Sequence, residues 1–67
     1  MTRIIKIDNT SEEKINEYLE IMQKDLQATI VHLQCYGANY DCYMIVYKCE
    51  KRIILKDILD REMVPLD

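Results

Sequence analysis

The chain has 67 residues, of which 49% are hydrophobic and 31% are charged, and its formal net charge is -3. These values describe one small domain over residues 1–67, because a chain of this size buries only about 60% of its unfolded surface and has no room for a second core. The hydrophobic share excludes a disordered chain, and no apolar run reaches the ~18 residues of a membrane span. In domains below ~70 residues, ordering entropy nearly cancels the hydrophobic gain, so a disulfide, a metal ion or a partner chain is expected to add stability.

The amino-terminal segment predicts a strand followed by a helix. Residues 3–7 are dominated by β-branched isoleucine, and residues 8–11 form a polar cluster that favours a turn or a helix N-cap. Ser11 or Thr10 is the expected N-cap, with acidic residues in the first turn, where the helix dipole favours negative charge. The apolar residues that follow recur at helical spacing and form one stripe: Ile15, Tyr18, Leu19, Met22 and Leu26.

The middle of the chain predicts a β-hairpin. Residues 28–36 alternate with period two, as a half-buried strand does, and residues 41–49 are again rich in tyrosine, isoleucine and valine. The break between them contains Gly37, the only glycine, and Asn39, both of which can adopt the positive φ of tight turns. A hairpin around Gly37–Asn39 is therefore the simplest connection.

We prefer the hairpin register that places Cys35 opposite Cys42, because it separates the side chains into an apolar face and a mixed face. The first helix is expected to pack on the apolar face, together with residues of the first strand. This predicted core consists of Ile5, Ile7, Val31, Leu33, Cys35, Met44 and Val46. The mixed face carries the remaining side chains, among them His32, Gln34, Tyr36, Tyr43 and Tyr47.

The segment after Cys49 predicts a second helix of about three turns. Its apolar stripe consists of Ile53, Ile54, Leu55, Ile58, Leu59 and Met63. Pro65, the only proline, marks its end, while β-branched residues 53–54 leave a strand extension as the alternative. The fold class is therefore predicted as α+β, in the order β-α-β-β-α. Its three-stranded sheet has the first helix on one face, and the other face is completed by the second helix or by another chain.

The cysteines do not predict a metal site or a nucleophile. Their number is odd, and no secretory leader precedes them, so we expect a reducing, cytoplasmic setting. In the preferred register Cys35 and Cys42 face the first helix while His32 and Cys49 face away, so four zinc ligands cannot converge and neither core cysteine has His32 within reach as a base. Without a glycine-rich phosphate loop or a buried carboxylate pair, we expect no enzymatic activity, no metal and no cofactor.

The aromatic residues predict an interaction surface. All five are tyrosines, four of them in or beside the hairpin, and tyrosine is enriched at protein interfaces. The expected partner-binding residues are His32, Gln34, Tyr36, Tyr43 and Tyr47, with Ile54, Ile58 and Leu59 supporting self-association in a homodimer. The alternative is that the second helix covers this face as ordinary core. Nucleic acid is not expected, because nine Lys and Arg are scattered among twelve Asp and Glu without a basic stripe.

Three segments carry a resemblance: residues 3–8 (RIIKID), 13–19 (EKINEYL) and 43–48 (YMIVYK). Over residues 3–48 the chain resembles the short βαββ proteins of low-GC Gram-positive bacteria and their phages, among them small sporulation-associated proteins. The resemblance implies a small regulatory or interaction role and no functional residue to transfer. Together with the size and acidity of the chain, this favours a non-enzymatic, dimeric regulator or inhibitor of a larger protein.

The concrete form of this hypothesis is a phage or mobile-element inhibitor of a host defence enzyme, such as an anti-CRISPR-type protein. Two alternatives stay open. One is a protein that sequesters a small ligand or nucleotide at a tyrosine-lined dimer interface, and the other is a sporulation-associated regulatory protein.

Overall fold

The computed structural model describes residues 1–62 and contains the five elements in the predicted order. The three strands form one open antiparallel sheet in the order β1-β3-β2, so that β3 is central and both other strands are edges. The α+β fold class with the order β-α-β-β-α is therefore confirmed. Met63 and Pro65, expected in and after the second helix, lie outside the described residues. The element bounds are β1 Thr2–Ile7, α1 Glu12–Lys24, β2 Thr29–Tyr36, β3 Cys42–Lys48 and α2 Leu55–Glu62.

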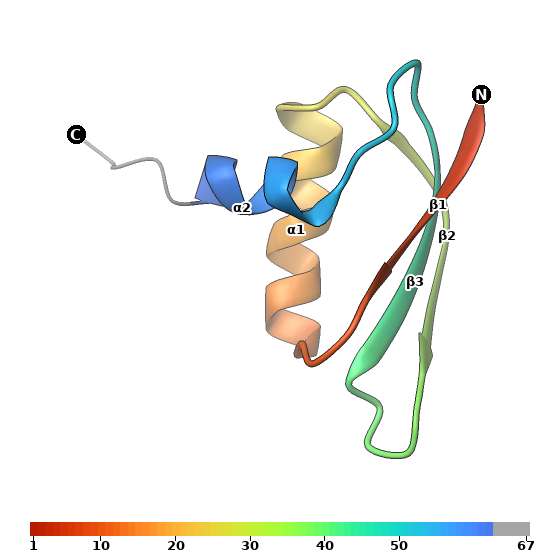
Figure 1. The fold of residues 1–67 in the computed structure, drawn as a ribbon, viewed down its shortest axis with the longest axis vertical. Helices are drawn as coiled ribbons and strands as arrows, with labels where there is room; N and C mark the ends of the chain where they lie inside the picture. The colour runs from red at the N-terminus through yellow and green to blue at the C-terminus, as the bar shows by residue number, and fades with distance from the viewer. Residues whose placement is uncertain (63–67) are drawn as a thin grey trace.

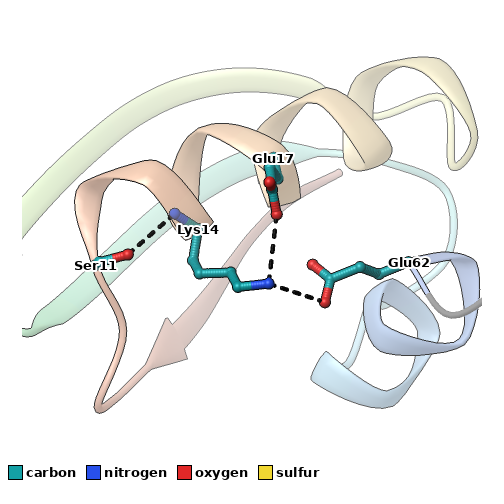
Figure 2. A network of polar contacts seen from close by, with 4 residues as sticks. All are labelled: Ser11, Lys14, Glu17 and Glu62. Carbon is teal, nitrogen blue, oxygen red and sulfur yellow. Dashed lines mark hydrogen bonds and ion pairs between the residues drawn. The ribbon is translucent and has the colours of Figure 1, made fainter.

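Both helices lie on the same face of the sheet (Figure 1). α2 packs against α1, and the Nζ atom of Lys14 lies 3.4 Å from Oε1 of Glu62, which joins the two helices by an ion pair (Figure 2). The expectation that the second helix completes the opposite face is therefore wrong. Within residues 1–62 no element covers that face.

One core fills the space between the sheet and the two helices. The central strand contributes its most deeply buried side chains, and the first strand contributes the predicted Ile5 and Ile7, whose burial is confirmed. The buried residues are Ile5, Ile7, Ile15, Tyr18, Met22, Ala28, Tyr43, Ile45, Tyr47, Ile53 and Ile58.

The hairpin register differs by one residue from the predicted one. Cys35 lies opposite Tyr43, and Tyr36 lies opposite Cys42. Because side chains alternate between the two faces of a strand, this difference places every side chain of β3 on the face opposite to the predicted one. Tyrosines and an isoleucine face the helices, whereas the residues predicted for the core, Met44 and Val46, face the opposite side.

The predicted burial of the β2 residues is also wrong. Leu33 and Cys35 lie on the helix side, but Leu33 is 37% exposed and Cys35 is exposed. Val31 is the extra residue of a β-bulge between Ile30 and His32, and it is 52% exposed. α1 does contact β2, but a groove between the two elements leaves Leu33 and Cys35 open to solvent.

Local signals in the sequence placed the element ends well. The Oγ atom of Ser11 accepts a hydrogen bond from the backbone N–H of Lys14 at 3.2 Å, so the predicted N-cap is confirmed (Figure 2). Gly37 adopts φ +98 in the hairpin turn, while the other positive φ of this turn falls on Tyr40 and not on Asn39. α2 begins at Leu55, so residues 53–54 belong neither to the second helix, in whose apolar stripe they were predicted, nor to the alternative strand extension.

Tyr47 explains how a tyrosine can occupy the centre of this core. Its hydroxyl accepts the backbone N–H of Ile53 at 2.8 Å and donates to the carbonyl of the same residue at 3.3 Å. A buried hydroxyl is tolerated when it is hydrogen-bonded, because its loss of water is then compensated. The same two bonds hold the segment that leads from β3 to α2 against the core.

Candidate functional site

The candidate site is the face of the sheet opposite the helices, which we call the open face. The strand register aligns its side chains in rows across the sheet: Ile4 lies beside Val46 and then His32, and Lys6 beside Met44 and then Gln34. The complete open face consists of Thr2, Ile4, Lys6, Thr29, His32, Gln34, Tyr36, Cys42, Met44, Val46 and Lys48.

The centre of the open face is apolar. Ile4 is 51% exposed, and Met44 and Val46 beside it are partly exposed. An edge strand and the central strand thus present adjoining aliphatic side chains to solvent. Single apolar residues are common on protein surfaces, but a contiguous apolar group usually marks a contact surface. The geometry is that of a contact surface with an apolar middle.

The paired strand positions of the open face carry basic side chains and no acidic ones. These basic side chains are Lys6 and Lys48, whereas the chain as a whole has a net charge of -3. The acidic residues lie mainly on the helices and loops. The paired strand positions of the open face are therefore basic and partly apolar, while the carboxylates of Asp8 and Asp41 lie at one corner of the face.

One corner of the open face holds Tyr36 opposite Cys42, close to the carboxylates of Asp8 and Asp41. Partial burial and the nearby charge of Asp8 raise the pKa of Tyr36. Partial burial and the two carboxylates raise the pKa of Cys42, whose thiol also lies 3.5 Å from Oδ1 of Asp41. A raised pKa keeps the thiol protonated, which makes it a poor nucleophile and a poor metal ligand.

The predicted partner-binding residues fall into two groups. His32, Gln34 and Tyr36 lie on the open face, as expected. Tyr43 and Tyr47 lie under the helices, where their side chains are 7% and 0% exposed, so the prediction that they share this face is wrong. The cause is the one-residue difference in register, since tyrosine is amphipathic enough to suit either a core or an interface.

The predicted self-association residues are also divided. Ile58 is completely buried in the core and is not available to a second chain in this structure. Leu59 packs partly against the same core, and only Ile54 is largely exposed. Ile54 and Leu59 thus keep exposed surface, and their role in self-association stays a prediction.

Sequence reasoning missed Ile4, Met44 and Val46 as exposed residues, although one signal pointed to them. Lys48 shares the period-two face of β3 with Val46 and Met44, and Lys6 shares that of β1 with Ile4. Because lysine is almost never buried without a partner, these two residues mark the solvent side of both strands.

Outside the open face, a cleft of about 570 Å³ lies between the turn after α1 and the segment that precedes α2. A second groove of about 520 Å³ lies between α1 and β2 and is lined in part by Asn16, Leu33 and Tyr40. Across residues 1–62, no three His, Cys, Asp or Glu side chains come together in a way that could hold a metal ion. The register places His32 and Cys35 on opposite faces, so the structure does not bring them together as a base and a thiol.

None of the helices within residues 1–62 has the length and apolarity needed to cross a membrane. The resemblance of residues 3–48 to short βαββ proteins stays a prediction. Comparison of the chain with protein-family models, with curated proteins and with solved structures finds no match.

Proposed function

We propose that this chain is a non-enzymatic protein-binding module that docks on a larger protein through the open face and thereby regulates or inhibits it. The observation that carries the proposal is the placement of both helices on one side of the sheet, which leaves the apolar centre around Ile4, Met44 and Val46 uncovered. Protein contact surfaces have such an apolar centre with a polar rim.

The charges of the open face indicate the chemistry of the partner. Lys6 and Lys48 flank the apolar centre, and no acidic side chain opposes them within the strand pairs. Complementary charges speed association and suppress wrong partners. The expected partner is therefore a protein surface with an apolar centre and acidic residues at its rim.

A nucleic-acid partner is less well supported. Recognition of single-stranded RNA uses several aromatic rings on which bases stack, with basic residues along the backbone. Among the described residues of the open face, the exposed rings are those of His32 and Tyr36, because Tyr43 and Tyr47 are buried beneath the helices. The same burial removes the tyrosine-lined interface on which a nucleotide-sequestering role would depend.

The most concrete form of the proposal is a phage or mobile-element inhibitor of a host defence enzyme. Support comes from the small size of the chain, its net acidity and the resemblance of residues 3–48 to small phage and Gram-positive βαββ proteins. A rigid sheet face of this kind would inhibit by occupying a surface that the enzyme needs for its substrate or for its assembly.

The proposal is tested by photocrosslinking in cells that naturally produce the protein. A photoreactive p-benzoylphenylalanine replaces Ile4 on the open face, and in a matched control it replaces Ile54, which is equally exposed at 51% but lies before α2. We expect one protein to be crosslinked from position 4 and not from position 54, and excess unlabelled chain should compete for it. Mass spectrometry identifies the adduct.

Three results would contradict the proposal: equal adducts from both positions, an adduct with nucleic acid from position 4, or an adduct only with a second copy of this chain. The complementary variant is Ile4→Glu in a chain that carries the photoreactive residue in place of Val46. We expect Ile4→Glu to abolish the protein adduct formed from position 46. The circular dichroism spectrum and the melting temperature should stay close to those of the natural chain.

A further inference from the structure

β2 is an edge strand that is exposed on both of its faces. It lies at the end of the order β1-β3-β2, and no other strand within residues 1–62 pairs with its outer side. Apart from Ile30, which packs partly against the core, every residue of β2 is exposed. Such a strand presents a row of backbone donors and acceptors that can pair with a further strand.

β2 also lacks the usual protection of a sheet edge. Natural edges are blunted by charged side chains, by proline or by bulges. The eight residues of β2 include no Lys, Arg, Asp, Glu or Pro, whereas the opposite edge, β1, carries Arg3 and Lys6. The only such device in β2 is the bulge at Val31, which leaves residues 32–36 as a regular run against β3.

We propose that β2 pairs in antiparallel fashion with β2 of a second copy of this chain, about a two-fold axis perpendicular to the sheet. Two three-stranded sheets then join into one continuous sheet. The regular run 32–36 is centred on Gln34, which lies opposite its own copy when the pairing avoids the bulge. Leu33 then pairs with Cys35 of the second copy, and His32 pairs with Tyr36.

The side chains of β2 suit this pairing. Residues paired across a two-fold axis must be self-complementary, and an uncharged strand brings no like charges together. On the helix side, Leu33 and Cys35 are exposed at the groove between α1 and β2, so the second copy would cover apolar surface there. On the other side, two Gln34 amides can hydrogen-bond to each other.

This pairing is distinct from docking through the open face. A two-fold axis perpendicular to the sheet keeps both pairs of helices on one side and both open faces on the other. The dimer would therefore present a doubled open face and leave Ile4, Met44 and Val46 uncovered. Failure of the dimer would leave the crosslink from position 4 intact, and failure of that crosslink would leave the dimer intact.

The test uses opposite charges at the two-fold axis. Sedimentation velocity and light scattering should show that the natural chain forms dimers, and that Gln34→Lys and Gln34→Glu each weaken dimerisation by about fivefold or more, because like charges then lie opposite each other. An equimolar mixture of the two variants should restore a heterodimer. That restoration separates a broken interface from a damaged fold, and circular dichroism of each variant provides a further check.

The proposed pairing of β2 with β2 of the second copy can be tested separately by disulfide formation. With Cys42 and Cys49 replaced by Ser, Leu33→Cys should form an intermolecular disulfide with Cys35 on mild oxidation, because directly paired strand residues have the Cα separation that a disulfide requires. Val31→Cys in the same background should not. Lys6→Glu on the other edge should leave dimerisation unchanged.

A natural chain that stays monomeric up to millimolar concentration would overturn the proposal. So would a dimer that resists both Gln34 variants, and so would a mixture of the variants that stays monomeric while each is folded.

Discussion

The two edges of the sheet differ in how they are protected. On β1, the inward residues Ile5 and Ile7 are buried under the helices and the outward residue Lys6 is charged. On β2, the inward residue Leu33 is partly exposed, and neither face carries a charge. The difference teaches that a two-helix layer of this size covers one edge and the centre of a three-stranded sheet, and that the remaining edge is left open to another chain.

The edges also differ in their ties to the rest of the chain. Arg3 of β1 donates from Nε to the carbonyl of Cys49 at 3.3 Å and from Nη2 to the carbonyl of Glu50 at 2.9 Å. The backbone N–H of Cys49 donates to the carbonyl of Met1 at 3.1 Å. From β2, the comparable side-chain bond is that of the Cys35 thiol to the carbonyl of Tyr40 at 3.2 Å, within the hairpin itself. Hydrogen bonds thus join β1 and Met1 to the segment after β3, whereas this bond of β2 stays within the hairpin turn.

The largest expected effect is a difference in the free energy of unfolding between alanine substitutions on the two edge strands. Ile7→Ala on β1 should lower the free energy of unfolding by about 3 kcal/mol, because it leaves a cavity in the core. Leu33→Ala on β2 should lower it by about 1 kcal/mol or less, because a partly exposed side chain loses less burial. Both are measured by urea unfolding in the Gln34→Lys background, where dimerisation is expected to be weakened and contributes less. Equal losses would mean that β2 is as well covered as β1.

The next largest effect compares two tyrosines. Tyr47→Phe should cost about 2 kcal/mol, because the N–H and carbonyl of Ile53 lose their partner in a buried setting. Tyr36→Phe on the exposed strand should change stability by less than about 0.5 kcal/mol. Thermal and urea unfolding of the two variants provide the measurement. A small loss for Tyr47→Phe would show that water replaces the hydroxyl.

A smaller effect concerns the N-cap of α1, which follows β1 in the chain. Ser11→Ala removes the N-cap bond to the N–H of Lys14 and should cost about 1 kcal/mol. Because the cap is part of α1, amide exchange in β1 should accelerate at least as much as in β2. Ser11→Asp is the control, since aspartate is an equally good N-cap and should retain stability. Unchanged stability in Ser11→Ala would contradict the role of the cap.

The smallest effect tests the link between the two helices. The hydrogen bond and charge of Glu62, followed by the charge of Glu17, raise the pKa of Lys14 above 10.5 (Figure 2). A raised pKa in the folded state means that the pair stabilises the fold at pH values below 10.5 and that this contribution is lost as pH rises through the raised pKa. Glu62→Gln should weaken this alkaline decline.

The melting temperature, followed at alkaline pH and at two salt concentrations, is the measurement, because salt screens an exposed pair. Amide exchange in β2 should not respond to Glu62→Gln, since the pair lies on the helix side. A response confined to β2 would contradict the separation of the two edges.

Much of the local structure could be predicted from residues close together in the chain. The Ser11 cap, the helical spacing after it and the turn at Gly37 are each decided by neighbouring residues, and each is confirmed. The facing of β3 was predicted wrongly, because it depends on a one-residue choice of register and two alternating patterns fit the same segment. Of the candidate site, His32, Gln34 and Tyr36 were placed correctly and the aliphatic centre was missed.

The sequence alone determined the order of the elements, the start of α1, the hairpin turn and the burial of Ile5 and Ile7, because capping, turn chemistry and periodicity act over a few residues. Only the tertiary structure decided that β3 is the central strand, that its tyrosines face inward and that α2 joins α1 on the same side. These features depend on contacts between distant segments, such as the bonds from the Tyr47 hydroxyl to Ile53, and no local pattern reports them. The open face exists because those long-range contacts placed both helices on the other side.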